Sequence, residues 1–223
     1  MTPAEVLGDI RRLIAVLTAH NLALDSNAVF EQSLPNRDIL ISVTRSMALS
    51  EMFDAFGTLD EYLWYLERRF FAGVLFDGSL LQITYRFERL VVKYHRLCFY
   101  PCPVTLDNDV VSEYGITEYL DLRREGGLDR AVLLPSPLRF DYDTGAAAEQ
   151  HPAVHLTLSE SFCRIPVAYL LSVGHFIRFV FAYFDPRIWS EVIGLRAIPC
   201  RRHDRVLQDP GDDNAFFDWR PGR

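Results

Sequence analysis

The sequence predicts an α+β fold: an antiparallel β-sheet flanked by helices, in a single domain with an N-terminal helix and a C-terminal tail. Apolar residues recur at helical spacing in residues 3–20, whereas residues 80–100 alternate between apolar and polar in two neighbouring runs. Neighbouring runs of this kind pair antiparallel. The chain has 223 residues, 49% of them hydrophobic, which is enough for one core. We therefore assign residues 1–199 to one domain and residues 200–223 to an extended tail.

Helix caps define the first two helices. Thr2 is placed to cap a helix over residues 3–20, which stops at Asn21. Thr58 and Glu61 have the spacing of a capping box, which predicts a second helix that ends near Gly73. Between these helices, residues 46–56 are compatible with either a helix or a loop.

The later helices and the strands follow from periodicity and turn signals. A short helix is expected over 115–125, before a Gly-Gly pair. Ser172 caps a last helix through about Tyr183, and apolar residues surround this helix almost completely, so it should lie at the centre of the core. Strands are expected at residues 28–34, 37–44, 80–88, 90–100, 138–143, 153–159 and 162–167.

Composition restricts the function classes. The formal net charge is −7, which argues against a global field that attracts nucleic acid. The first residues hold no signal-peptide core and no apolar run is long enough to span a membrane, so we expect a cytoplasmic protein with reduced thiols. No glycine-rich phosphate loop is present, and we expect no cofactor.

Charged residues concentrate between Leu138 and Pro166, in a region that otherwise reads as strands. Arg139, Asp141 and Asp143 share one face of a strand, because side chains alternate. The two carboxylates could hold a divalent metal, but a salt-bridged face in which Arg139 neutralises an aspartate is the interpretation we favour. We expect Arg164 to be partly buried and paired with Asp141 or Asp143, although Arg164 and Arg139 could instead grip a phosphate or a carboxylate.

Histidines and cysteines add three further hypotheses. His155 and Thr157 resemble half of a two-histidine phosphoesterase motif, but a second half is lacking, so a core histidine is favoured. His151 is a further binding candidate beside it. The spacing of the candidate ligands disfavours a zinc site. Cys163 is a weak candidate for a nucleophile that acts with His155. The zinc hypothesis involves His95, Cys98, Cys102 and Cys163. We therefore expect no metal site.

Five segments of the chain read FDGSLLQITY, YHRLCFYPCP, LRFDYD, HPAVHLTL and FCRIP, and a hydrophobic helix follows them. Together these segments resemble an uncharacterised bacterial family, the domain-of-unknown-function family 2290 (DUF2290). The family carries no assigned activity, so the resemblance implies neither a reaction nor a ligand. It implies a setting among bacterial defence genes and one structural signature. That signature comprises Asp77, Gly78, His95, Arg96, Pro101, Pro103, Arg139, Asp141, His155, Arg164 and Pro166.

Three functions stay open. The first is a non-catalytic binding or scaffold subunit that acts with a protein partner or as a homo-oligomer. It is suggested by 13% aromatic residues, by the apolar last helix and by a tail that contains Phe216, Phe217 and Trp219. The second is a metal-dependent nuclease or phosphoesterase in which Asp141 and Asp143 bind the metal and His155 is the base.

The third function is nucleic-acid binding along the paired strands. Its cations would be Arg86, Arg89, Lys93 and Arg96, and its stacking surfaces Tyr85, Tyr94 and Phe99. The acidic net charge makes this function the least favoured of the three.

Overall fold

The computed structural model describes residues 1–43, 58–127, 137–145, 152–159, 163–201 and 206. Within these residues, one antiparallel sheet has the strand order β1-β4-β5-β6-β7-β8-β9, and β3 pairs with both β2 and β5. The strands are β1 (Ala23–Ser26), β2 (Phe30–Ser33), β3 (Ile39–Ser42), β4 (Gly73–Leu75), β5 (Leu80–Glu88), β6 (Val91–Tyr100), β7 (Leu138–Asp143), β8 (Val154–Leu158) and β9 (Arg164–Pro166). This architecture confirms the predicted α+β class.

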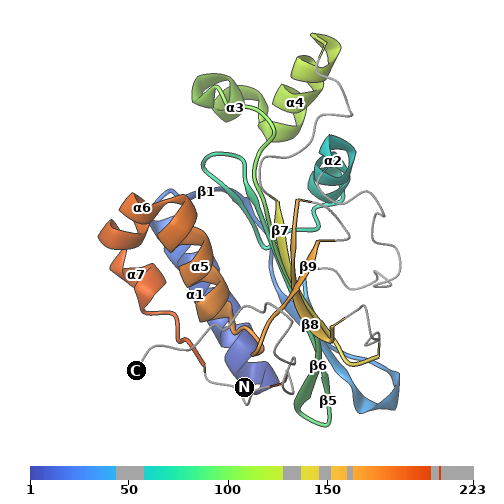
Figure 1. Ribbon diagram of the computed structural model, residues 1–223. Helices are drawn as coiled ribbons and strands as arrows, with labels where there is room; N and C mark the ends of the chain where they lie inside the picture. The colour runs from blue at the N-terminus through green and yellow to red at the C-terminus, as the bar shows by residue number, and fades with distance from the viewer. Residues whose placement is uncertain (44–57, 128–136, 146–151, 160–162, 202–205, 207–223) are drawn as a thin grey trace.

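Helices cover both faces of the sheet (Figure 1). On one face lie α1 (Pro3–Ala19) and α5 (Val173–Phe184), followed by the short helices α6 (Pro186–Glu191) and α7 (Ile193–Arg196). On the other face lies α2 (Leu59–Glu67), and beyond the end of the sheet lie α3 (Asn108–Tyr114) and α4 (Ile116–Glu125). The central strands are therefore enclosed between two layers.

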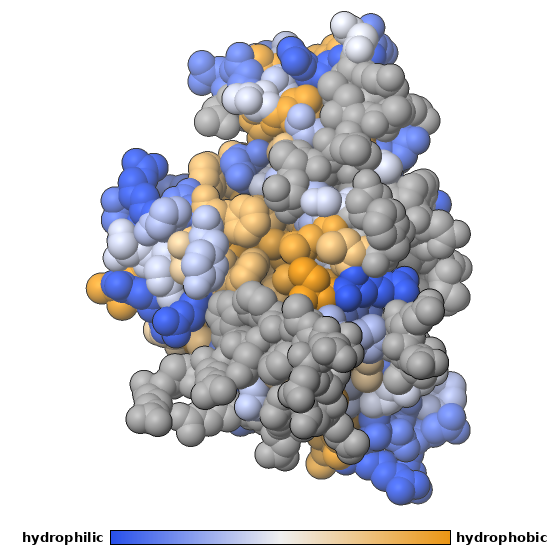
Figure 2. Space-filling view, viewed as in Figure 1, coloured by the Kyte–Doolittle hydropathy of each residue, from blue (hydrophilic) through white to orange (hydrophobic). Residues whose placement is uncertain are grey.

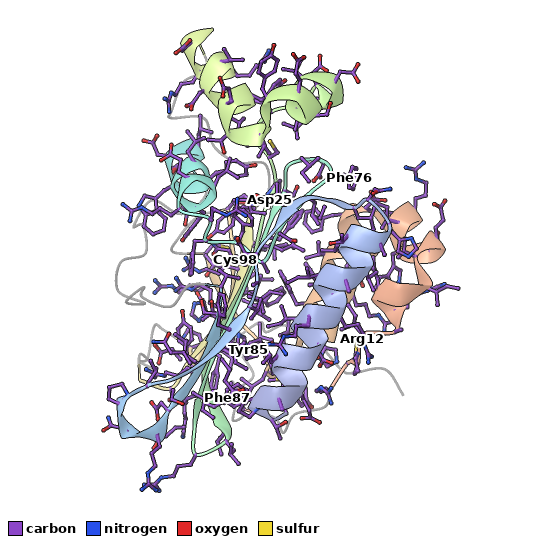
Figure 3. The ribbon with its side chains drawn as sticks, turned by 180° about the vertical axis from the view of Figure 1, so that it is seen from behind. Arg12, Asp25, Phe76, Tyr85, Phe87 and Cys98 are labelled. Carbon is purple, nitrogen blue, oxygen red and sulfur yellow. The ribbon has the colours of Figure 1, made fainter. Side chains whose placement is uncertain are left out.

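The larger core lies between the sheet and α1 and α5. The odd-numbered residues of β5, among them Tyr85 and Phe87, point into it and are completely buried. The Tyr85 hydroxyl donates a hydrogen bond to the Leu171 carbonyl at 2.8 Å, which satisfies its polar end in the apolar layer. Figure 3 shows this layer from behind, with Arg12 on α1 and both rings along the sheet.

A smaller core lies between α2, α4 and the opposite side of β5 and β6. Glu61 is fully buried there, and its carboxylate accepts hydrogen bonds from the hydroxyls of Tyr65 and Tyr100, each at 3.2 Å. Hydrogen bonds of this kind offset the cost of removing a carboxylate from water.

Two helix ends are fixed by left-handed residues. At the end of α1, Asn21 has a φ of 53° and the Leu22 N–H donates to the Leu17 carbonyl, so the predicted stop is confirmed. The second helix ends earlier than predicted. Arg69 has a φ of 54°, and its guanidinium bonds to Asp25 at 2.6 and 3.0 Å, which holds the chain as it turns towards β4.

Short elements escaped the sequence prediction, because three to seven residues carry too little periodicity. They are β1, β4, α3, α6 and α7. The prediction that α5 lies at the centre of the core is correct for its first turns and wrong for its end. Tyr183 is 70% exposed and Phe184 is 43% exposed.

The segment after Pro199 was predicted to be an extended tail, and this boundary stays a prediction. Arg201 forms a bidentate ion pair with Asp9 of α1, with N–O distances of 2.7 and 3.0 Å. Val206 packs partly buried against the larger core. The aromatic residues Phe216, Phe217 and Trp219 lie outside the described residues, as do the ambiguous residues 46–56.

Gly174 in the first turn of α5 should tolerate no side chain. A Cβ at this position would lie 2.3 Å from the Pro199 carbonyl oxygen, so Gly174→Ala must displace a backbone segment. We expect this variant to lose about 2 kcal/mol of unfolding free energy or more, measured by urea denaturation.

Gly8→Ala is the matched control, since no atom lies within 4 Å of a Cβ on Gly8 in the middle of α1. Alanine at that position should stabilise the protein by up to about 1 kcal/mol. Equal effects of the two substitutions would contradict the close contact between α5 and residues 198–200.

Candidate functional site

The candidate site lies on the face of β5–β9 that points away from α1 and α5, here called the polar face. The register places Arg96, Asp141 and His155 directly beside one another on β6, β7 and β8. A second row runs in parallel and contains Gln82, Cys98, Arg139, Thr157 and Arg164. The strand alternation therefore brings together the predicted site residues of β7, β8 and β9.

Asp141 lies at the centre of the polar face and is bonded from two sides. Arg96 Nε donates to one carboxylate oxygen at 2.8 Å, and Arg139 Nε donates to the other at 2.6 Å. Burial by itself would raise the pKa of Asp141, but the two guanidinium groups outweigh this effect and lower the pKa to about 2. Asp141 is therefore ionised and held in place throughout the physiological pH range.

His155 is buried and completes the first row. Its Nδ1 lies 2.9 Å from the Pro152 carbonyl, so Nδ1 carries the proton, because a carbonyl oxygen only accepts. Its Nε2 then faces the nearer oxygen of Asp141 at 3.6 Å. This geometry matches the favoured interpretation of His155 as a core histidine.

The expected partner of Asp141 was partly wrong. Arg139 does neutralise the aspartate, but Arg164 does not take part and is exposed at the sheet edge. Within the described part of the chain, Arg164 has no ion pair with Asp141 or Asp143. The position beside Asp141 belongs to Arg96, which the sequence analysis had grouped with Asp141 in the family signature and had otherwise placed in the nucleic-acid hypothesis. Nothing in the sequence states which residue of a strand will stand opposite another strand 45 positions away.

Among the described residues of the polar face, two buried hydroxyl groups have no hydrogen-bond partner. They belong to Thr157, which is completely buried, and to Tyr94, which is 5% exposed. Burial is the main reason that the pKa of Tyr94 is raised, and Arg96 opposes this rise. Buried hydroxyls normally find a partner. The sequence analysis named Thr157 and Tyr94 for other roles, but the sequence could not show that their hydroxyl groups lack a partner within the described residues.

The candidate zinc ligands do not lie together in the structure. His95 points into the larger core, between the rings of Tyr85 and Tyr142, whereas Cys98 points to the polar face. Burial raises the pKa of Cys98 to about 12, so this thiol stays protonated. The described residues contain no group of three potential metal ligands. Cys163 stands opposite Leu158 rather than beside His155, which removes the proposed nucleophile and base pair.

The carboxylates of the metal hypothesis share the polar face. Asp143 stands opposite Tyr94, one row away from Asp141, and its Oδ1 accepts the Gly145 N–H at 2.8 Å. His151 lies outside the described residues.

The stacking surfaces of the nucleic-acid hypothesis are not accessible. Tyr85, Tyr94 and Phe99 are each 5% exposed or less, and Tyr85 and Phe99 belong to the larger core. Of the predicted cations, Arg89 is exposed at the end of the β5–β6 hairpin, while Arg96 is engaged with Asp141.

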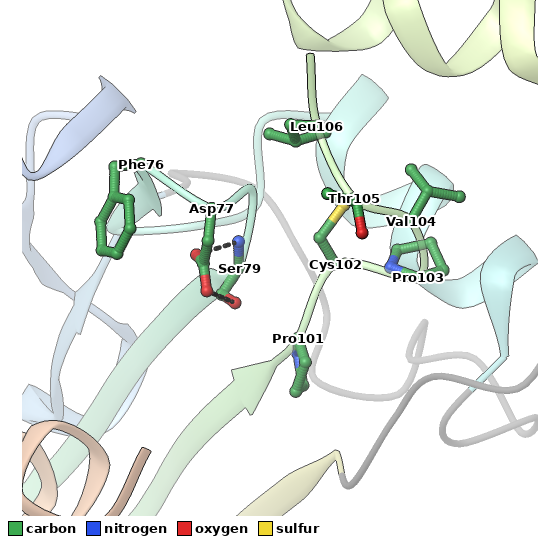
Figure 4. A pocket seen from close by; sticks show the side chains of 9 residues that line it. All are labelled: Phe76, Asp77, Ser79, Pro101, Cys102, Pro103, Val104, Thr105 and Leu106. Atoms are coloured by element: carbon green, nitrogen blue, oxygen red, sulfur yellow. Dashed lines mark hydrogen bonds between the residues drawn. The ribbon is translucent and has the colours of Figure 1, made fainter. Parts of the chain in front are cut away.

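A separate cavity of about 500 Å³ lies where the turn before β5 meets residues 101–106 (Figure 4). The FDGS and PCP segments, which the sequence analysis grouped in one signature, lie against each other at this cavity. Gly78 has a φ of 83°, and a Cβ there would lie 2.9 Å from Cys102 Sγ. The Asp77 carboxylate bonds to the backbone and hydroxyl of Ser79, and burial raises the pKa of Cys102. These groups are engaged in structural contacts, so the cavity presents no activated nucleophile.

Comparison with known protein families gives one match. Residues 22–215 match the family described as "Uncharacterized conserved protein (DUF2290)". No curated protein and no solved structure matches the chain. None of the helices within the described residues has both the length and the apolar character needed to cross a membrane.

Removing the charge of Asp141 should strongly destabilise the protein. Asp141→Asn leaves the buried guanidinium groups of Arg96 and Arg139 without their shared carboxylate, and we expect a loss of about 3 to 5 kcal/mol at pH 7. Asp143→Asn is the control, since its carboxylate bonds to a backbone N–H and should cost no more than about 1 kcal/mol. Urea denaturation of the three proteins measures both effects.

The same variants test the ionisation of Asp141. Its pKa is depressed in the folded state, so its contribution is present above the unfolded pKa of about 4 and is lost as the pH falls towards 2. Wild type should lose about 2 kcal/mol more than Asp141→Asn in this window. A difference between the two proteins that stays constant from pH 5 to pH 2 would show that Asp141 is not ionised in the fold.

Proposed function

The chain belongs to the DUF2290 family, and we propose that it is a non-catalytic binding subunit that docks a partner protein on an apolar surface between α5 and β9. The observation that carries this proposal is a band of apolar side chains at the open edge of the larger core (Figure 2). The family resemblance suggests anti-phage defence as the setting of such a subunit.

The α5–β9 surface comprises Phe179, Tyr183 and Phe184 on the helix and Leu158 and Ile165 on the strands. Tyr183 is 70% exposed and packs against Phe179 with tilted rings whose centroids lie 5.4 Å apart. Exposed aromatic rings anchored on a rigid helix are typical of residues that dominate the energy of a protein interface.

Buried core residues connect the aromatic rings on the helix to the sheet edge. Phe179 packs edge-on against Phe140 at 5.3 Å, and Phe140 stands beside Leu156, which in turn stands beside Ile165. Apolar patches that extend from a core to the surface mark interaction sites in soluble proteins.

The charge of the chain favours a different protein over a second copy as the occupant. Each copy carries a net charge of −7, so two copies repel each other, whereas a basic protein is attracted. We therefore expect a basic partner that presents an apolar segment to Tyr183 and Phe184.

The contacts of the polar face support a structural rather than a catalytic role for its acidic residues. Both oxygens of Asp141 accept hydrogen bonds from arginines, and Nδ1 of His155 is engaged with a carbonyl. A catalytic base or a metal ligand needs an accessible lone pair in the resting protein.

The metal-dependent nuclease or phosphoesterase remains the second proposal, because Asp141, Asp143 and His155 do share one face. A metal ion would have to displace two guanidinium groups from Asp141. Cleavage of DNA or RNA that requires Mg²⁺ or Mn²⁺ and is lost in Asp143→Asn, a variant expected to fold, would support this activity. Nucleic-acid binding would be supported by salt-sensitive retention on a DNA or RNA column.

A charge at Tyr183 should abolish the proposed interaction. Tagged wild type, Tyr183→Glu and the control Tyr114→Glu are isolated from the native host, and the partner that differs between them is purified and titrated. Tyr114 on α3 is 51% exposed and lies outside the α5–β9 surface. We expect Tyr183→Glu to weaken binding at least about 30-fold, and Tyr114→Glu to leave it unchanged.

Light scattering on the isolated chain separates the possible occupants. A monomer that binds the basic partner supports the proposal. A dimer that Tyr183→Glu dissociates assigns the surface to a second copy, and co-purifying proteins that are identical for all three chains overturn the docking surface altogether.

A further inference from the structure

A small cavity, here called the aspartate pocket, lies at the end of α5. Its apolar walls include the rings of Phe76, Phe99 and Phe184, and Asp77 and Asp185 line it as well. Its volume is about 50 Å³, several times the roughly 10–15 Å³ that one water molecule needs. Pockets for cofactors or drug-sized ligands measure roughly 300–1,000 Å³, so this one has the size of a single side-chain head group.

Neutral donors fix both carboxylates of the aspartate pocket in place. The Asp77 carboxylate accepts hydrogen bonds from the N–H and the hydroxyl of Ser79 at 2.9 and 3.0 Å. Asp185 caps α6 by accepting the Ile188 N–H at 3.0 Å. A carboxylate can accept about four hydrogen bonds, so each keeps acceptor positions for a ligand. Because both side chains are already positioned, binding would require little reorganisation.

The charges of these two carboxylates are not neutralised by the described part of the chain. Neither Asp77 nor Asp185 forms an ion pair with another described residue. Asp77 is exposed, Asp185 is partly exposed and Phe184 is 43% exposed, so a cation can reach the pocket from solvent (Figure 4 shows Phe76 and Asp77). Aromatic rings beside the carboxylates attract a cation further through their faces.

We propose that the aspartate pocket binds the guanidinium group of an arginine side chain. This inference rests on the proposed function, because the partner that docks on the α5–β9 surface supplies the arginine. Phe184 belongs to both the surface and the pocket, and its ring centroid lies 6.5 Å from that of Phe179. One partner segment can therefore contact both.

The chemistry of the pocket favours arginine over lysine. A guanidinium carries five N–H donors in one plane, so it can bond to two carboxylates at the same time. Its flat face and its apolar stem would cover the rings of Phe99 and Phe184, which lie 4.8 Å apart between centroids. A lysine ammonium is more strongly hydrated and lacks this planar arrangement of donors.

The first test needs no partner. N-acetyl-L-argininamide is titrated into the full chain and followed by NMR of the backbone amides, with the neutral N-acetyl-L-citrullinamide as the matched control ligand. We expect the arginine compound alone to give saturable shifts around residues 76–77 and 184–185, with a dissociation constant on the order of 1 mM. Asp185→Asn should weaken this binding at least about 10-fold, because a hydrogen bond between charged groups is lost.

The substitutions are chosen to preserve the fold. Asparagine caps a helix as well as aspartate does, and its side-chain oxygen supports the same turn, so Asp185→Asn and Asp77→Asn should unfold at nearly the wild-type urea concentration. Asp109→Asn is the matched control, since it removes the same charge on α3 outside the pocket. It should leave the affinity for N-acetyl-L-argininamide unchanged.

The second test uses the partner purified in the Tyr183 experiment. Asp77→Asn and Asp185→Asn should each weaken its binding at least about 10-fold, whereas Asp109→Asn should not. Arginines of the partner are then replaced by glutamine one at a time. One of these partner variants should bind wild type and Asp185→Asn with equal affinity, because the group that the carboxylate contacts is gone.

The two tests separate this inference from the docking proposal. If the partner loses affinity for Tyr183→Glu but binds Asp77→Asn and Asp185→Asn as tightly as wild type, the docking surface stands and the arginine pocket is overturned. If no partner depends on Tyr183, the docking proposal fails and the argininamide titration decides the pocket. Equal shifts from the arginine and citrulline compounds, or equal affinity of wild type and Asp185→Asn for the arginine compound, would overturn it.

Discussion

The carboxylate of Asp141 is held between two arginines in the middle of a sheet that is covered on both sides, and this arrangement constrains the rest of the polar face. Arg96 comes from β6, Asp141 and Arg139 come from β7, and His155 comes from β8. A shift of one residue in either strand pairing would turn the aspartate into the apolar core and leave buried guanidinium groups unpaired. A buried ion pair is weak evidence for stability, but here it specifies the register of three strands.

The polar face is unevenly satisfied from one row to the next. Around Asp141, each oxygen has a donor, whereas one row further the Thr157 hydroxyl has no partner within the described residues. Buried polar groups in folded proteins are normally satisfied, so the fully bonded carboxylate fits a structural role.

The sequence was sufficient for features that depend on neighbours in the chain. The cap at Thr2, the stop at Asn21 and the alternation of β5 and β6 are all local, and each is present in the structure. The same alternation placed Arg139, Asp141 and Asp143 on one face. Tyr85 and Phe99 lie on the apolar face of this alternation, in the larger core. The burial of Tyr94 on the polar face could not be read in this way, because a period of two does not say whether the second face is also covered.

Pairing across strands was beyond the sequence for a different reason. Arg96 and Arg164 are both arginines at polar positions of strands, and only the order and register of the strands decide which of them stands beside Asp141. The order β6-β7-β8-β9 places Arg96 next to the aspartate and Arg164 two strands away at the edge. The residues that the sequence predicts as one cluster therefore lie in two different environments, one buried around Asp141 and one at the exposed edge of the sheet.

The edge strand β9 contributes side chains to both faces of the sheet. Arg164 and Ile165 are consecutive, so their side chains point to opposite faces, one to Thr157 and the other to the apolar band that includes Phe179. With three residues, β9 is paired on one side only to β8, and a short edge strand of this kind is held by few hydrogen bonds. This short strand therefore places a charged side chain on the polar face and an apolar side chain on the α5–β9 surface.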